Sequence, residues 1–541
     1  MKAKHLYALS ILSGLILSLG WPMHGFPWLL FFGFVPLLFI EDHIQQNSHN
    51  FHKYSILKYS YVAFIVWNTL TTWWIWNSTI FGAIMAVLLN SLFMAIAFWL
   101  FHLSKKSFYS RSNAIYLLII FWIAFEYLHL DWDLSWPWLN LGNGFANYTK
   151  WVQWYEFTGT LGGTFWILLL NILFFKLIKK ILGKTEGRMS IISNSITALL
   201  VLMIPMIFSI ILFSNYEESG ESVEVIISQP NIDPYTEQYN TPVKEVIDRT
   251  LGIAEPLITE KTRFLVCPES ALQESIWHHV AEESRSVVLI RRFLEKYPQL
   301  NIVIGASTFR LFEENEPLTR TARQFADVEK YYDAYNTALF INDSAPVGLY
   351  HKSKLVPGPE KMPFQRLLKP LQHLAFDLGG TVGSLGTSAE PTVFSSKCGH
   401  YHVPAIICYE SVYGNFTAEF VRNGANILFI ITNDGWWGNT PGHRQHFLFA
   451  PLRAIETRRS IARSANTGIS AFINQRGDIL QTTEYWVADA IKATLQTNTQ
   501  LTFYVKHGDY IGRICTFLGV FLLLIALTAS VINRDKLKPA K

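Results

Sequence analysis

The chain has 541 residues, of which 50% are hydrophobic and only 16% are charged, and it contains 18 Trp and 39 Phe. This composition is too apolar for an ordinary soluble enzyme and predicts a membrane protein. The formal net charge is +4. The basic residues gather in short segments beside hydrophobic stretches, where membrane topology explains them better than nucleic acid does, so we expect no nucleic-acid partner.

Eight apolar stretches come near the length of about 20 residues that crosses a bilayer. The first follows Lys2 and Lys4, as the core of a secretory signal would, but Gly20-Trp21-Pro22 offers no cleavage site for a signal peptidase. We therefore expect the first stretch to stay in the protein as a helix. The eight expected spans are 6–21, 26–41, 58–76, 80–102, 114–129, 159–178, 192–214 and 512–533.

The charges of the loops set the expected orientation. Lys and Arg gather in alternate loops, and by the positive-inside rule those loops and both termini lie in the cytoplasm. The long polar segment from about 215 to 511 then lies outside, which in a bacterium is the periplasmic side of the inner membrane. The basic loop residues are Lys2, Lys4, Lys53, Lys58, Lys105, Lys106, Arg111, Lys176, Lys179, Lys180, Lys184, Arg188, Arg534, Lys536, Lys538 and Lys541.

The outer segment alternates short β-rich runs with helical patterns, which predicts an α/β domain with buried sheets. The pattern alone does not distinguish a two-sheet sandwich from a doubly wound sheet. We expect helices over residues 1–214, a linker over 215–222, the α/β domain over 223–505, and a last helix with a basic cytoplasmic tail over 506–541. The expected strands are 223–227, 264–266, 301–304, 337–341, 405–407, 427–431 and 469–473, and the expected helices are 242–260, 284–298, 412–423 and 444–459.

Three positions at the ends of expected strands carry reactive side chains, namely Glu269, Lys352 and Cys408. A carboxylate can take a thiol proton, a thiolate can attack a carbonyl, and an ammonium can hold the resulting oxyanion, so this set can transfer an acyl group through a thioester. A strand-to-helix turn at 408–412, together with Lys352, is expected to lower the pKa of the thiol. The oxyanion would be bound by Lys352 and the backbone amide of Tyr409.

Each of these residues also has an ordinary structural interpretation. Cys408, between Ile and Tyr, resembles a buried small hydrophobe, Lys352 fits a surface charge cluster, and Glu269 fits a helix cap. Cys267 ends an apolar strand and is expected to pack in the core. We expect neither a metal nor a cofactor, because no metal-ligand spacing and no disulfide pattern relates Cys267, Cys398, Cys408 and Cys515.

Six motifs occur in the order and spacing of the nitrilase superfamily: Gln229-Pro-Asn231, Pro268-Glu269-Ser270, Tyr350–Pro357, Ile407–Ser411, Thr432–Gly438 and Arg463–Gly468. With several spans before this domain and one after it, the whole chain resembles the apolipoprotein N-acyltransferase family. The outer loop Ser135–Gly142 is similar to that family's tryptophan-proline-tryptophan-type loop. The resemblance implies a membrane domain of about eight transmembrane helices and an extracytoplasmic αββα sandwich.

The resemblance also implies residue roles. It makes Glu269 the general base, Lys352 the essential lysine and Cys408 the nucleophile, and it gives supporting roles to Glu360, Tyr409 and Glu410. From the residues alone, Glu360 and Glu410 fit ordinary ion pairs equally well. The segment 356–360 reads Val-Pro-Gly-Pro-Glu where the family usually has Pro-Phe-Gly-Glu, and Tyr235 and Tyr239 stand where a tryptophan is expected.

The reaction implied by the resemblance takes an acyl chain from a phospholipid, phosphatidylethanolamine in the family, and gives it to the amino group of a diacylglyceryl-cysteine on a lipoprotein. Two other classes stay open from the residues: a membrane-anchored hydrolase with the same three side chains, and a transporter or scaffold without activity. Some aromatic residues of 362–364, 436–437 and 447–449 are expected to line a cleft for the acyl chain. The substrate-binding candidates are Tyr239, Phe364, Trp436 and Trp437.

Overall fold

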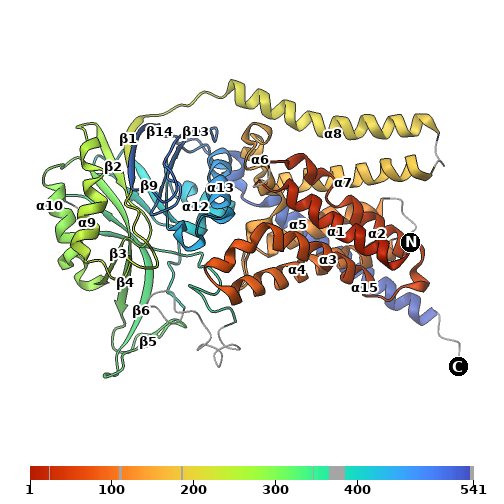
Figure 1. Ribbon diagram of the computed structural model, residues 1–541, viewed down its shortest axis with the longest axis horizontal. Helices are drawn as coiled ribbons and strands as arrows, with labels where there is room; N and C mark the ends of the chain where they lie inside the picture. Colours follow the sequence, from red (N-terminus) through yellow and green to blue (C-terminus); the bar gives the residue numbers. More distant parts are fainter. Residues whose placement is uncertain (23–24, 109–112, 184–186, 345, 365–383, 537–541) are drawn as a thin grey trace. The chain divides into compact units, whose positions relative to one another are not determined.

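The computed structural model describes residues 1–22, 25–108, 113–183, 187–344, 346–364 and 384–536. The chain divides into two compact units, one made of Met1–Asn215 with His507–Lys541 and the other of Tyr216–Lys506. The first unit consists of helices and the second is built on two β-sheets (Figure 1).

Helices occupy all eight expected spans. Among the described residues, six helices are long and apolar enough to cross a membrane, and the apolar helical segment Ala114–Leu128 is shorter. The chain is therefore a membrane protein. The helices of this unit are α1 (Ala3–Gly20), α2 (Val35–Gln46), α3 (Ser55–Thr72), α4 (Ile80–Ser107), α5 (Leu117–Leu128), α6 (Tyr155–Thr158), α7 (Thr160–Gly183), α8 (Arg188–Asn215) and α15 (Tyr510–Lys536).

A buried carboxylate at the end of α5 organises the loop that follows it. Glu126 accepts hydrogen bonds from Trp122 Nε1 at 3.0 Å, from the backbone N–H of Leu141 at 2.8 Å and from Thr164 Oγ1 at 2.6 Å. These donors belong to α5, to the loop and to α7. A buried polar group in a membrane protein needs such partners, and here they tie the tryptophan-rich loop to two helices.

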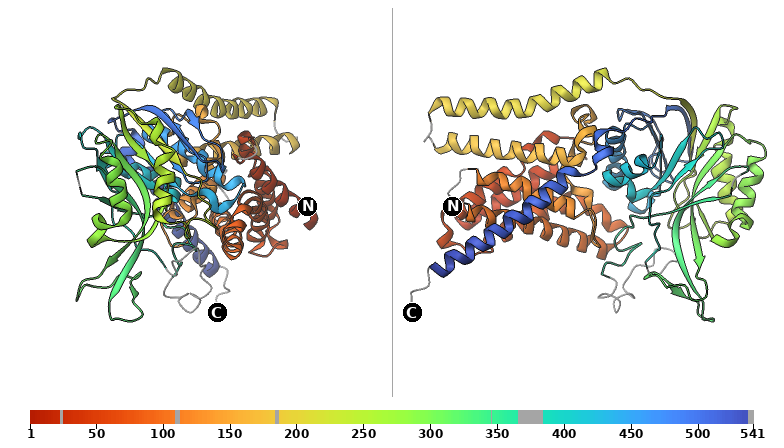
Figure 2. Two further views of the ribbon diagram at one scale, coloured as in Figure 1. Left: turned by 60° about the vertical axis from the view of Figure 1, so that its left-hand side comes forward. Right: turned by 180° about the vertical axis from the view of Figure 1, so that it is seen from behind.

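The helices α7 and α8 run side by side (Figure 2), and Trp166 of α7 donates its indole N–H to the backbone carbonyl of Val201 in α8 at 2.7 Å. Only Ala198 and Ser209 of α8 are buried. The other faces of α8 expose Leu, Ile, Met and Phe side chains. Such a helix is stable where lipid covers its apolar side chains.

The larger sheet of the second unit has eight strands. The strands β1, β2 and β4 run parallel at its centre, and β6 pairs antiparallel with β4 and with β7. The order is β14-β1-β2-β4-β6-β5, with β3 on β4 and β7 on β6. The strands are β1 (Ser222–Gln229), β2 (Thr262–Val266), β3 (Leu272–Trp277), β4 (Asn301–Leu311), β5 (Arg323–Gln324), β6 (Tyr331–Ile341), β7 (Gly348–His351) and β14 (Asp489–Gln496).

The smaller sheet has six strands in the order β13-β12-β11-β10-β9-β8. Its central strands β9, β10 and β11 run parallel, so their carboxyl ends meet at one edge. The strands are β8 (Val393–Ser395), β9 (His402–Ile407), β10 (Leu428–Thr432), β11 (Ile461–Ala465), β12 (Ala471–Ile473) and β13 (Ile479–Thr482).

Helices cover the outer face of each sheet, and the two sheets face each other (Figures 1 and 2). The rings of Phe264 in β2 and Phe429 in β10 meet between the sheets at 5.1 Å. This arrangement is an αββα sandwich with mixed sheets and confirms the expected fold class. The helices are α9 (Val243–Gly252) and α10 (Arg285–Leu294) on the larger sheet, α12 (Gly414–Arg422) and α13 (Pro441–Thr457) on the smaller one, and α14 (Phe503–His507) near the end of the unit.

One expected helix is longer than the helix in the structure. The helix expected over 242–260 ends at Gly252, and a short 3-10 turn Glu255–Leu257, which contains Pro256, follows it. The helix expected over 412–423 is confirmed as α12, within two residues at each end. A 3-10 helix Cys408–Val412 precedes α12, and the extended backbone of Tyr413 separates them.

Candidate active site

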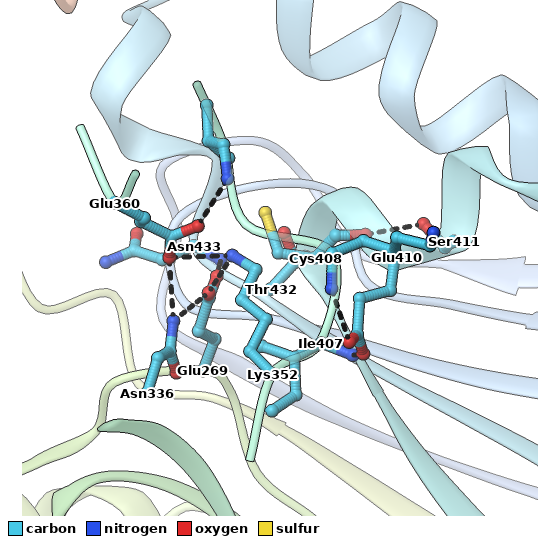
Figure 3. A network of polar contacts seen from close by, with 12 residues as sticks. Glu269, Asn336, Lys352, Glu360, Ile407, Cys408, Glu410, Ser411, Thr432 and Asn433 are labelled. Carbon is cyan, nitrogen blue, oxygen red and sulfur yellow. Dashed lines mark hydrogen bonds and ion pairs between the residues drawn. The ribbon is translucent and has the colours of Figure 1, made fainter. Parts of the chain in front are cut away.

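The ends of three strands bring Glu269, Lys352 and Cys408 together (Figure 3). Glu269 follows β2 and Lys352 follows β7 in the larger sheet, whereas Cys408 follows β9 in the smaller one. Their relative exposures are 6%, 1% and 8%. The predicted set is therefore assembled between the two sheets and is shielded from water.

The ammonium of Lys352 lies between two carboxylates. Its Nζ is 3.0 Å from Glu269 Oε1 and 2.8 Å from Glu360 Oε1. Asn336 Nδ2 donates to the same two oxygens at 2.8 and 3.0 Å, and the backbone N–H of Asn433 donates to Glu269 Oε2 at 3.0 Å (Figure 3). The donors of Asn336 and Asn433 therefore hold the two carboxylates in fixed positions beside Lys352.

This arrangement fixes the charge of Lys352. Burial by itself lowers the pKa of the ammonium, but the carboxylates of Glu269 and Glu360 outweigh burial and raise that pKa well above its ordinary value. Lys352 therefore stays charged and cannot act as a base. An ammonium has three N–H donors, so one is left for an oxyanion after two are directed at the carboxylates.

Cys408 starts the 3-10 helix in a left-handed backbone conformation, with φ of +51°. For a residue with a Cβ this conformation costs about 1–2 kcal/mol and marks a site where neighbouring structure holds the backbone. Ser411 Oγ donates to the Cys408 carbonyl at 2.7 Å. The close-up shows the Cys408 side chain beside the ammonium of Lys352 (Figure 3).

The expected lowering of the thiol pKa is wrong as a net effect. Burial raises the pKa of Cys408 well above its ordinary value, the Glu269 carboxylate raises it further, and the Lys352 ammonium only partly opposes them. The resting thiol is therefore neutral. Transfer of its proton to Glu269 would remove one of the negative charges that disfavour the thiolate.

Glu410 joins the two sheets at the site. Its carboxylate accepts hydrogen bonds from Ile407 N at 2.8 Å, Ser353 N at 2.6 Å and Tyr350 OH at 2.7 Å. These donors flank Cys408 in one sheet and Lys352 in the other. Burial raises the pKa of Glu410 to about 7 although the donors favour the ionised form. Hydrogen bonds therefore hold the Glu410 carboxylate, whereas an ion pair was one interpretation of this residue from the sequence.

The other supporting candidates also lie at the site. Tyr409 is buried, and its ring meets that of Tyr413 edge to face at 5.3 Å. The second oxygen of Glu360, Oε2, accepts the backbone N–H of Val356 at 2.8 Å. Gly358 between them has φ of +98°, which suits glycine alone, so the unusual 356–360 sequence forms a tight turn that presents Glu360 to Lys352.

The substrate-binding candidates are more exposed than the residues around Cys408. Tyr239 and Phe364 are 44% and 42% exposed, and Trp436 and Trp437 are half-buried. By contrast, Phe447 and Phe449 are buried in α13 and belong to the core of the unit. Of the three aromatic segments, 362–364 and 436–437 are therefore the ones that present rings at the surface of the unit.

Three buried residues behind Cys408 were given no role from the sequence. Asp434 Oδ1 lies 2.9 Å from His446 Nδ1, and Asp434 Oδ2 accepts from Arg463 Nη2 at 2.7 Å. Burial opposes ionisation of Asp434, but Arg463 and His446 outweigh it and hold the pKa of Asp434 well below its usual range. Asp434 and Arg463 lie in the motifs 432–438 and 463–468, which match the superfamily but gave no indication of what these two residues do. His446 lies in none of the six motifs.

The atoms Cys408 Sγ, an Asp434 oxygen and a His446 nitrogen lie within 4.8 Å of one another, a spacing that a metal ion can bridge. Arg463 argues against a metal here. Its Nη2 is 2.7 Å from Asp434 and 3.1 Å from His446 Nδ1, so a cation would face a guanidinium that already neutralises the carboxylate. The cluster fits a buried ion pair.

Two sequence models of known protein families match this chain. The sequence model described as carbon-nitrogen hydrolase matches residues 227–502, and the chain belongs to this family. The model described as the apolipoprotein N-acyltransferase N-terminal domain matches residues 13–173. These matches confirm the resemblance found in the motifs.

Similar proteins cover both units. The apolipoprotein N-acyltransferase of Chlorobaculum tepidum is 28% identical over 530 residues, 96% of each chain, and that of Geobacter metallireducens is 25% identical over 94% of this chain and 93% of the relative. Among solved structures, Saccharomyces cerevisiae Nit3, a member of branch 10 of the nitrilase superfamily, is 15% identical with a TM-score of 0.36, over 52% of this chain and 91% of Nit3.

Replacing Glu410 by Ala is expected to destabilise the second unit strongly. The change leaves the donors of Ile407, Ser353 and Tyr350 buried without their acceptor, and each such group costs about 1–3 kcal/mol. We expect the free energy of unfolding in detergent to fall by about 3 kcal/mol or more, and by less in Glu410→Gln, which keeps one acceptor oxygen. Glu245→Ala, on the exposed face of α9, is the control. A loss in Glu410→Ala no larger than in this control would contradict the bridging role.

Proposed function

We propose that the chain is an apolipoprotein N-acyltransferase, which moves an acyl chain from a phospholipid, through a thioester on Cys408, to the α-amino group of an N-terminal diacylglyceryl-cysteine. The observation that carries the proposal is that relatives of this name match 96% of the chain, the helical unit included. A soluble amide substrate would not require a large helical unit. The buried Glu269, Lys352 and Cys408 supply the chemistry.

In the first half-reaction, the Cys408 thiol passes its proton to Glu269 as the sulfur attacks the ester carbonyl of the phospholipid. The oxyanion that forms accepts the remaining N–H of Lys352 and, we infer, the backbone N–H of Tyr409. When the intermediate collapses, the C–O bond breaks and Glu269 returns its proton to the departing alkoxide. The products are a lysophospholipid and the Cys408 thioester.

In the second half-reaction, the neutral amine of the lipoprotein attacks the thioester carbonyl and gives a proton to Glu269. The C–S bond then breaks, an amide is released and Cys408 regains the proton from Glu269. The reaction balances without a redox partner or a metal ion. Because the acyl group waits on Cys408 between the two steps, the low exposure of this site protects the thioester from hydrolysis.

The proposal places the protein in the bacterial inner membrane. It assigns the helices of 1–214 and 506–541 to the bilayer, both termini to the cytoplasm, and the 215–222 linker with the catalytic domain of 223–505 to the periplasm. The alternation of basic loops supports this topology. Phosphatidylethanolamine is the proposed acyl donor, by resemblance to the family.

Intact mass spectrometry after incubation with phosphatidylethanolamine tests the proposal directly. We expect wild type to gain the mass of one acyl chain in a hydroxylamine-sensitive bond, and Cys408→Ala to gain none. Addition of a diacylglyceryl peptide should then remove the adduct and acylate the peptide amine. An adduct lost only to water would instead identify a membrane-anchored hydrolase, and no adduct on a folded protein would favour a scaffold without activity.

Polar substitutions of the surface aromatics test the lipid cleft. We expect Phe364→Ser and Trp437→Gln to slow acyl-enzyme formation from phospholipid by about tenfold, the effect of losing roughly 1.4 kcal/mol of apolar contact. The thermal midpoint should change little, because neither side chain is fully buried. Tyr331→Ser, at a half-buried aromatic residue in β6, is the control. Unchanged donor kinetics in both variants would count against the cleft.

A further inference from the structure

We propose that His446 is held as an imidazolium behind Cys408 and that its positive charge, together with that of Lys352, stabilises the Cys408 thiolate. His446 does not reach the reacting atoms in this role. It is a positioning residue that acts on the nucleophile through the Cys408 backbone and through its charge. The reaction it would assist rests on the proposed function, but the state of the thiol can be measured without that reaction.

The hydrogen-bond geometry around the imidazole favours a proton on both nitrogens. Nδ1 of His446 lies 2.9 Å from Asp434 Oδ1, which accepts only, because Asp434 is ionised. Nε2 lies 3.1 Å from the Cys408 carbonyl oxygen and 3.1 Å from Ser411 Oγ. A carbonyl also accepts only. Both ring nitrogens therefore face oxygen acceptors, although Nδ1 also faces the Arg463 Nη2 donor at 3.1 Å.

The hydroxyl of Ser411 does not remove this preference. Its proton is directed at the Cys408 carbonyl at 2.7 Å, so Oγ presents a lone pair to His446 Nε2. If the hydroxyl instead donated to a neutral Nε2, the Cys408 carbonyl would lose this donor and face a nitrogen lone pair at 3.1 Å. The imidazolium satisfies Asp434, Cys408 and Ser411 at once, and neither neutral tautomer does.

The charges and rings around His446 can be weighed one by one. Asp434 is the anion that favours the imidazolium, and Arg463, whose Nη2 is 3.1 Å from Nδ1, opposes it. Arg463 is also bound to Asp434 and to the backbone carbonyl of Ile469. The ring of Trp437 packs edge to face with His446 at 5.7 Å.

With His446 protonated, the group of Asp434, Arg463 and His446 carries one positive charge in excess. A nitrogen of His446 lies within 4.8 Å of Cys408 Sγ. An opposite charge at such a distance lowers the pKa of an acidic group by about one to three units. Burial and the carboxylates of Glu269 and Asp434 all disfavour the thiolate, and the excess positive charge offsets part of their effect.

The test is the pH dependence of Cys408 alkylation by iodoacetamide in the full-length protein. Label is measured on the peptide that contains Cys408, because Cys398 is exposed and also reacts. Glutamine is uncharged but keeps an amide donor of similar reach. We therefore expect His446→Gln to move the alkylation midpoint upward by about one to three pH units and to retain the rate at the high-pH plateau. His446→Lys, which keeps the charge, should stay closer to wild type.

His443→Gln is the matched control, because His443 is also buried on α13 but stacks on the ring of Tyr485 at 3.9 Å. Its midpoint should equal that of wild type. The proposal is overturned if the midpoint of His446→Gln stays at the wild-type value, or if the Gln and Lys variants shift equally. Failure of acyl transfer with the predicted alkylation profiles would instead contradict only the proposed function.

Discussion

The site depends on one buried ammonium held between two carboxylates. Lys352 lies 3.0 Å from Glu269 and 2.8 Å from Glu360, and it is almost completely enclosed. Removing one partner of a buried ion pair costs about 3–5 kcal/mol, so each member constrains the positions of the others. A second carboxylate also has a consequence for the proposed reaction: if Glu269 takes the thiol proton and becomes neutral, Glu360 still balances Lys352. The Lys352 ammonium could then donate a hydrogen bond to the oxyanion while it stays paired with Glu360.

The αββα sandwich makes this arrangement possible because the proposed catalytic groups come from different sheets. Glu269 and Lys352 belong to the larger sheet and Cys408 to the smaller one. The hydrogen bonds that cross between them include those from Ser353 N to Glu410 and from Asn433 N to Glu269. Both of these bonds use backbone N–H donors, whose positions follow from the strands that precede them. Small relative movements of the sheets would therefore disturb both the proton acceptor and the nucleophile.

Much of this account could be predicted from the sequence, because short apolar runs and the motifs around Glu269, Lys352 and Cys408 are local signals. The membrane helices and central strands followed from hydropathy in the same way. Other features depend on contacts between distant segments. Strand β11 was not expected because Arg463 and Ser464 interrupt its apolar pattern, although tertiary contacts bury both. The pKa of the Cys408 thiol was expected to fall because the sequence does not show that the two sheets enclose this side chain. His446 acquires its partners only when β9, β10 and α13 assemble.

The central claim is that Glu269 accepts the thiol proton during attack, and quenched single-turnover acylation of Glu269→Gln measures it most directly. Glutamine keeps the size of Glu269 and an oxygen for Lys352 and Asn336, but it cannot take a proton. With acyl-enzyme followed by intact mass, we predict a rate of Cys408 acylation at least about 100-fold below wild type in a protein that is still folded at the assay temperature. Acylation of the folded Glu269→Gln protein at the wild-type rate would contradict the account.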